Sequence, residues 1–359
     1  GKGIQRAGRE EFSNELIEVT VIANDPMYDA IHSTQGNMME LPVNKLNKLP
    51  GILGETDVIK TMQLMPGINP GGEGGASFFV RGGEADQNLV ILDEATVYNV
   101  GHLIGFFSVF NSDAVKDVKI YKGGFPANYG GRLSSVIDVK MKEGHMKEFH
   151  GSGSIGLIAS KLAFEGPIVK DKVSFIISAR RTYIDQVFKL INFPLPYYFY
   201  DLNFKLNYKI NNKNRLYFAS YIGDDVSNVD SDTEFIKQDT TIDGRIIDPA
   251  FGFKLGNRTA TLRWNHIYNS RMFSNVSLIY NRFMYNAEAS DGINNLVTGS
   301  RIDDITCKLD YDYNPGKKHS LKWGALFTSH TFYPNMLFSE GEITDLVQSK
   351  DTMELFSGE

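Results

Sequence analysis

The sequence has almost no cysteine and no long hydrophobic run. Its single cysteine, Cys307, cannot form an internal disulfide or a thiolate metal site, and the seven histidines lie scattered from His32 to His330 without zinc-ligand spacing. We therefore predict no metal and no cofactor. No apolar run approaches the roughly 20 residues of a membrane-spanning helix, and residues 1–11 are too polar for a signal peptide.

An excess of positive charge is also missing. The net charge is −6 and no lysine or arginine cluster occurs, which argues against a nucleic-acid partner. No arrangement of a nucleophile with its base, or of paired carboxylates, stands out, so we predict that the chain is not an enzyme. The run PGGEGG lacks the Gly-Lys-Ser/Thr ending of a phosphate-binding loop. The abundant residues are 34 Gly, 24 Phe and 17 Tyr, which suit a β protein with many turns and aromatic girdles.

Up to about Gly144 the sequence is glycine-rich and mixed in character, with one clear helix candidate at residues 54–65. Pro66 and Gly67 end this helix. Its apolar residues recur at helical spacing and are predicted to face a core: Val58, Ile59, Met62 and Met65.

From residue 149 onward, apolar and polar residues alternate with a period of two, which is typical of strands with two different faces. Between Asp201 and Ile210 one face is wholly apolar and the other carries Asp, Asn and Lys. Such a polar face suits a water-filled lumen, so we predict that the apolar face meets lipid. The residues assigned to lipid are Leu202, Phe204, Leu206, Leu262, Trp264, Ile305 and Leu309.

Short turns and long connections alternate along this second region. Turns are predicted at 169–172, 211–214, 269–271 and 314–318, and long polar connections at 184–200, 224–253, 288–301 and after 333. This rhythm matches the periplasmic and extracellular ends of an outer-membrane barrel, with about nine strands present and a tight first hairpin near 158–160. Because bacterial single-chain barrels have an even strand number, we expect the chain to be a fragment.

A soluble β-sandwich is the competing fold, because its strands alternate in the same way. Runs such as 258–268 and 271–285 exceed the usual length of about 5 to 6 residues and fit the tilted strands of a membrane barrel better.

Several motifs in the first region follow one another in order: LPVNKLNKLPGILGETDVIKTMQLMPGI, FFVRGGEADQNLVILDEATVYN and HLIGFFSVFNSDAVKDVKIYKGGFPANYGGRLSSVIDVKMKEG. They cover residues 41–144 almost continuously, and GSGSIGLIASKLAFEGPI and SFIISARRTYID follow them. In this order the motifs resemble the plug and barrel entry of TonB-dependent outer-membrane receptors, in the form found in Bacteroidetes.

The resemblance implies a membrane β fold, in which a mixed α/β plug lies inside an antiparallel barrel of about 22 strands when complete. We expect an N-terminal linker at residues 1–35, a plug region at 36–145 and a barrel region at 146–359. Two positions depart from the family. Glu94 replaces the glycine of Leu-Asp-Gly and places a side chain in a turn, and Asn128 stands where the family often has an arginine.

Three charged residues are candidate plug-to-barrel contacts. The resemblance implies that Arg81 and Arg132 face acidic groups of the barrel wall, and Glu165 is one candidate partner; solvation in a wet lumen is the alternative. Turn glycines flank the short apolar strands of the plug region, where the chain must reverse direction, and we assign them a structural role: Gly82, Gly83, Gly123, Gly124, Gly130 and Gly131.

Residues 16–25, LIEVTVIAND, resemble a TonB box, most clearly in Glu18, Val19, Thr20, Val21, Ile22 and Ala23. A β-prone segment ahead of a folded domain can add as a strand to the sheet edge of a partner through main-chain hydrogen bonds. The alternative is an ordinary N-terminal strand.

The resemblance implies active import across the bacterial outer membrane, with TonB and membrane lipid as partners. A surface lipoprotein or other subunits of an outer-membrane complex are further candidate partners. The runner-up function is a structural or sensory subunit of such a complex. The substrate-binding residues stay open, and siderophore, cobalamin, peptide and glycan ligands all remain candidates.

Overall fold

The computed structural model describes residues 38–42, 56–71, 75–102, 105–190, 192, 196–229, 241–242, 245–246, 250–291, 294–316, 319–340 and 349–358. The chain divides into two units, Gly1–Gly36 and Asn37–Glu359, and every described residue belongs to the second. The expected linker at 1–35 and its TonB-box-like segment therefore lie outside the described residues.

The plug region is built on a five-stranded mixed sheet in the order β1-β8-β9-β4-β5. Strand β4 runs parallel to β9, and the other neighbours pair in the antiparallel sense. Its apolar side chains form the main core, which includes Val118, Ile120, Ile137 and Val139. The strands are β1 (Met38–Pro42), β4 (Asn88–Leu92), β5 (Ala95–Thr96), β8 (Val115–Tyr121) and β9 (Ser135–Met141).

Helix α3 (Val58–Gln63) packs against this sheet through Val58, Ile59 and Met62, all fully buried. The predicted core face is therefore confirmed. The carboxylate of Asp57 accepts the Lys60 N–H at 3.0 Å and caps the helix, so it begins later than predicted. Small elements complete the region: β2 (Ile68–Pro70), β3 (Phe78–Val80), the 3₁₀ turn η1 (Ala85–Gln87), β6 (Gly101–His102) and β7 (Phe107–Ser108). Among the described residues, no helix is long and apolar enough to cross a membrane.

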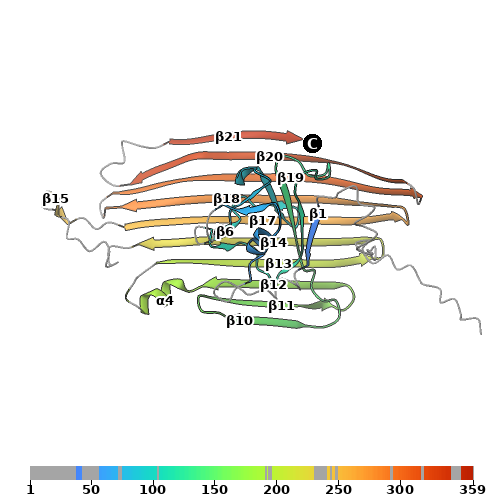
Figure 1. Ribbon diagram of the computed structural model, residues 1–359, viewed down its shortest axis with the longest axis horizontal. Helices are drawn as coiled ribbons and strands as arrows, with labels where there is room; N and C mark the ends of the chain where they lie inside the picture. Colours follow the sequence, from blue (N-terminus) through green and yellow to red (C-terminus); the bar gives the residue numbers. More distant parts are fainter. Residues whose placement is uncertain are drawn as a thin grey trace, which may run out of the picture. The chain divides into compact units, whose positions relative to one another are not determined.

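The barrel region forms one sheet of ten antiparallel strands, in which Figure 1 shows the strands side by side in chain order from green β10 to red β21. They are β10 (His150–Ile155), β11 (Ala159–Val169), β12 (Val173–Thr182), β13 (Tyr197–Asn211), β14 (Asn214–Val229), β17 (Ala250–Asn269), β18 (Met272–Ser290), β19 (Asn295–Gly316), β20 (His319–Glu340) and β21 (Ser349–Gly358). Helix α4 (Ile184–Leu190) lies between β12 and β13, and the hairpin of β15 (Thr241–Ile242) and β16 (Arg245–Ile246) lies between β14 and β17.

The four predicted short turns all join neighbouring strands of this sheet. The sequence predicts about nine strands and the sheet has ten, because β21 lies in the stretch after residue 333 that reads as a long polar connection. Strands β13, β14, β17, β18, β19 and β20 hold 15 to 22 residues, far beyond the usual length of about 5 to 6.

The ten-stranded sheet buries its polar face and exposes its apolar face. On β13 the alternate residues Asp201, Asn203, Lys205 and Asn207 are buried, with at most 3% of their surface exposed. On the other face Leu202, Leu262, Trp264 and Ile305 keep 38%, 43%, 41% and 57% exposure. The predicted alternation of faces is confirmed. A soluble sandwich would bury the apolar face, so this pattern excludes it.

Candidate functional site

The plug region contacts the ten-stranded sheet most densely through residues 93–102, which we call the latch segment. This segment follows β4 and includes β5 and β6. Its side chains pair with residues on four strands of the sheet, namely β13, β14, β17 and β19. The buried polar face of the sheet therefore has a specific partner in the plug region.

The latch segment begins with a strained turn at Asp93 and Glu94, whose φ angles are 45° and 76°. A carboxylate oxygen of Asp93 accepts from Lys205 Nζ on β13 at 3.0 Å. Glu94 Oε1 lies 3.4 Å from Arg263 Nη1 on β17, and both side chains are largely buried. A left-handed backbone costs a non-glycine residue about 1 to 2 kcal/mol. The two ion pairs offset this strain.

The charge of Glu94 is fixed by its surroundings. Burial alone would raise the pKa of its carboxyl, but Arg263 and, more weakly, Lys140 and Lys308 lower the pKa to about 2. Glu94 is therefore ionised throughout the physiological pH range. Position 94 thus has the left-handed backbone that suits a glycine, and its glutamate side chain forms an ion pair with Arg263 of the sheet.

At the other end of the latch segment, His102 lies between two buried carboxylates. Its Nε2 is 2.7 Å from Asp201 Oδ1 on β13, and its Nδ1 is 2.7 Å from Asp225 Oδ2 on β14. The imidazole stacks on Phe199, with ring centroids 4.3 Å apart and planes 3° from parallel. Because both ring nitrogens face acceptors, both must donate, and the ring is the doubly protonated imidazolium.

Further groups complete the surroundings of His102. Arg180 on β12 donates to Asp201 Oδ2 at 2.6 Å and to the Ser108 carbonyl at 2.7 Å. Tyr221 donates to Asp201 Oδ1 at 2.7 Å, and Tyr197 donates to Asp225. Two cations thus face two carboxylates in a closed cluster.

Burial would lower the pKa of His102, but the charges and hydrogen bonds of Asp201 and Asp225 outweigh it and raise the pKa to about 9. The imidazolium form inferred from the geometry is therefore the form present at neutral pH. Since this charge is buried and paired on both sides, removing it leaves two carboxylates without their shared donor.

The middle of the latch segment reaches the more distant strands. Tyr98 donates to Asp304 Oδ2 on β19 at 2.6 Å, and burial beside that carboxylate raises the pKa of the phenol. The Asn99 backbone exchanges hydrogen bonds with the amide of Asn257 on β17, at 3.3 and 2.8 Å. The latch segment therefore contacts the polar face of the ten-stranded sheet from β13 to β19.

A comparison with known families shows what the plug region resembles. Residues 51–136 match the family TonB-dependent Receptor Plug Domain. Over these residues the chain is similar to that family. No curated protein sequence matches the chain.

Solved structures share the fold of the plug domain together with the strands around it. A mutant of the ferric enterobactin receptor of Pseudomonas aeruginosa matches with a TM-score of 0.62 and 14% identity, over 94% of this chain and 56% of that one. The ferric preacinetobactin receptor BauA of Acinetobacter baumannii matches at 0.55 and 12%, over 88% and 49%. FpvA of P. aeruginosa, bound to a pyoverdine with iron, matches at 0.55 and 15%, over 89% and 45%. The chain spans about half the length of these structures, and the likeness concerns the fold.

None of the charged residues predicted from the resemblance belongs to the latch segment, although the charge of Arg132 acts on Tyr98 within it. Arg81 is exposed on the plug domain, and Arg132 is half-buried and donates to the Gly131 carbonyl at 2.9 Å. Glu165 is half-buried on β11. Their pairing across the interface stays a prediction.

The turn glycines of the plug domain occupy reversals of the backbone. Gly82, Gly123, Gly124 and Gly131 have φ between 59° and 81°, the left-handed region that glycine tolerates best. Gly83 must be glycine for a different reason, because a Cβ at this position would lie 2.6 Å from the Cβ of Ser134. Gly130 is half-exposed beside Gly131.

The sequence analysis missed Asp93, Glu94 and His102 as plug-domain contacts. Part of the signal was present, because Asp201 and Lys205 were assigned to the polar face of their strand. That face needs partners wherever a plug fills the lumen. Nothing in the sequence identifies which plug residues meet it.

Proposed function

We propose that the protein is a TonB-dependent importer of the bacterial outer membrane, in which the plug domain closes the lumen of a transmembrane β-barrel. One observation supports this most strongly. The large sheet turns an apolar face outward and a charged face inward, and the charged face is paired with a plug domain through the latch segment. A lipid-facing wall around a plugged polar lumen is the arrangement that gated import requires.

In this mechanism an external ligand binds above the plug domain, and TonB pulls on the segment Glu18–Ala23 from the periplasm. The pull must break the pairs made by the latch segment before the plug domain can rearrange. The barrel wall stays intact because its strands are joined by continuous ladders. The latch segment thus sets part of the force that opens the path.

We place the domain boundaries of this importer at 1–35 for the linker, 36–145 for the plug region and 146–359 for the barrel region, in a receptor of the Bacteroidetes type. Two solved structures of similar fold are named as receptors for ferric enterobactin and ferric preacinetobactin, and an iron chelate is the first ligand class to test for this protein. Cobalamin, peptides and glycans follow. A structural or sensory subunit, with a surface lipoprotein as its partner, is the alternative.

The coupling step gives a direct test. If Glu18–Ala23 pairs with TonB through its backbone, Val19→Pro and Val21→Pro remove a ladder donor and should abolish capture by the periplasmic domain of TonB. Thr20→Ala keeps the backbone and should be captured as the wild type is. All three variants should reach the outer membrane in equal amounts.

Cells carrying each variant are then supplied with a panel of ferric siderophores and cobalamin, and uptake is measured. Import that is lost in both proline variants and kept in Thr20→Ala supports the proposal. Normal capture of TonB by both proline variants contradicts it and favours the structural subunit.

A further inference from the structure

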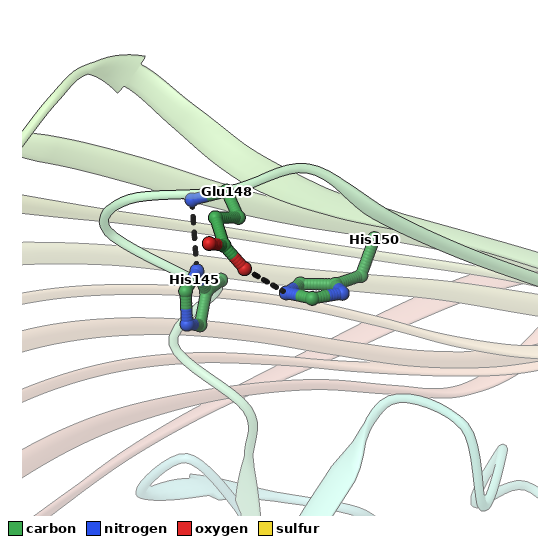
Figure 2. A group of neighbouring side chains, drawn as sticks. All are labelled: His145, Glu148 and His150. Atoms are coloured by element: carbon green, nitrogen blue, oxygen red, sulfur yellow. Dashed lines mark hydrogen bonds and ion pairs between the residues drawn. The ribbon is translucent and has the colours of Figure 1, made fainter.

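The loop that joins the plug domain to the first strand of the barrel region brings together two imidazoles and a carboxylate. This junction loop, residues 142–149, connects β9 to β10. His145 and Glu148 lie on it, and His150 is the first residue of β10. Figure 2 shows the three side chains turned toward one another on the same side of the loop. One ligand atom from each lies within 4.8 Å of the other two.

The geometry of the three groups is that of a partial coordination sphere. Glu148 Oε2 lies 3.9 Å from His150 Nε2, and the two imidazole rings are 4.7 Å apart and nearly perpendicular. No other group of this kind occurs among the described residues.

The loop is held in place on both sides. The Lys142 N–H donates to the Ala114 carbonyl at 2.8 Å, and the Ser174 hydroxyl donates to the Glu143 carbonyl at 2.8 Å. The Asp171 N–H donates to the Met146 carbonyl at 3.1 Å. Since the backbone is already ordered, ligand binding there costs less conformational entropy than on a free loop.

His145 also presents an acceptor nitrogen. Its Nδ1 accepts the Glu148 N–H at 2.9 Å and the Lys147 N–H at 3.4 Å, so this nitrogen acts as an acceptor. A metal bound at Nδ1 replaces these hydrogen bonds.

We propose that His145, Glu148 and His150 bind a divalent transition-metal ion, of which Zn²⁺ is the model. Two imidazoles with one carboxylate form a known zinc ligand set, and water fills the remaining positions. Ca²⁺ and Mg²⁺ prefer oxygen ligands and do not fit two nitrogens. The bound ion cross-links the junction loop to the first residue of β10. The inference does not depend on the proposed transport function.

The sequence predicts no metal because its histidines are scattered, and the proposed site departs from that prediction. Four residues separate His145 from His150, which lies within the His-x₃₋₅-His spacing of zinc sites. With Glu148 between them, the segment reads HMKEFH. The segment is hard to recognise as a metal site in the sequence because no cysteine or second histidine pair accompanies it.

Metal binding is tested on the full chain purified in detergent, by titration with ZnCl₂ in a calorimeter. The wild type should bind one Zn²⁺ per chain. The double variant His145→Ala with His150→Ala should lose more than about 100-fold in affinity, beyond the roughly 10- to 100-fold that loss of an outer-shell partner costs. His319→Ala removes an exposed histidine on β20 and should bind as the wild type does.

A second variant separates ligand loss from loop damage. His145→Asn keeps a side-chain acceptor for the Glu148 N–H and removes the imidazole, so it should retain the loop and lose the metal. With Cu²⁺ as probe, electron paramagnetic resonance should show two coordinated nitrogens in the wild type and one in His145→Asn. Wild-type protein that binds no Zn²⁺, or that binds it as the double variant does, overturns the proposal.

Discussion

The His102 cluster predicts that the plug domain loses stability when a single imidazole is removed. In His102→Gln the buried carboxylates Asp201 and Asp225 lose the donor that they share. Breaking a buried, hydrogen-bonded ion pair on one side costs about 3 to 5 kcal/mol, and the lost stack on Phe199 adds to this. Because Arg180 still neutralises Asp201, we expect a loss of about 3 to 4 kcal/mol.

This loss should appear in the plug domain and not in the barrel wall. Both tryptophans, Trp264 and Trp323, lie on strands of the large sheet, so their fluorescence follows the wall, while cleavage by a protease follows the plug domain. With a denaturant slope of about 1 to 3 kcal/mol per molar urea, the urea midpoint of the plug domain should fall by about 1 to 4 M in His102→Gln. The fluorescence midpoint should move far less.

The pH dependence gives an independent check with a definite sign. The pKa of His102 is raised from 6.5 to about 9 in the folded protein. A raised pKa means that the contribution is complete below the unfolded pKa and disappears as the pH rises through the folded pKa. Between pH 6.5 and 9.5 the wild type should therefore lose about 3 kcal/mol of plug stability.

The variant His102→Gln should lack this pH-dependent loss, whereas His319→Ala should keep it. An equal pH dependence in His102→Gln and in the wild type would refute the assignment of the titrating group. Equal urea midpoints would refute the structural role of the cluster.

Two further pairs of substitutions test the faces of the barrel sheet and the strained turn. Leu206→Arg places a charge on the lipid-facing side and should cost roughly 2 to 4 kcal/mol of stability near the membrane midplane. Asn207→Ala, on the opposite face, should cost far less stability. Heat-modifiable mobility of the refolded protein measures both variants, and equal effects contradict the assigned faces. Glu94→Gln keeps the strain at φ 76° and removes the charge opposite Arg263, while Glu94→Gly relieves the strain. We therefore expect Glu94→Gln to lower the plug's urea midpoint more than Glu94→Gly, and the reverse order would show that relief of the strain is worth less than the side-chain contacts that glycine removes.

Local patterns in the sequence determined the layout of this protein. The alternation at residues 201–210 set which side chains of β13 face inward, because neighbouring residues of a strand point to opposite faces whatever surrounds them. In the same way the spacing of Val58, Ile59 and Met62 set the buried side of α3. Short turns fixed which strands pair, since strands joined by a few residues lie side by side.

Only the tertiary structure decided which charged residues of the plug domain pair with the polar face of the large sheet. His102 pairs with Asp201 across 99 positions of sequence and with Asp225 across 123, and no local rule connects residues so far apart. Their meeting depends on how the plug domain docks against the wall, and docking is set by the packing of whole surfaces. A buried charge must find a partner, so the sequence could require pairs for Lys205 and Asp201, but it could not identify Asp93 and His102 as those partners.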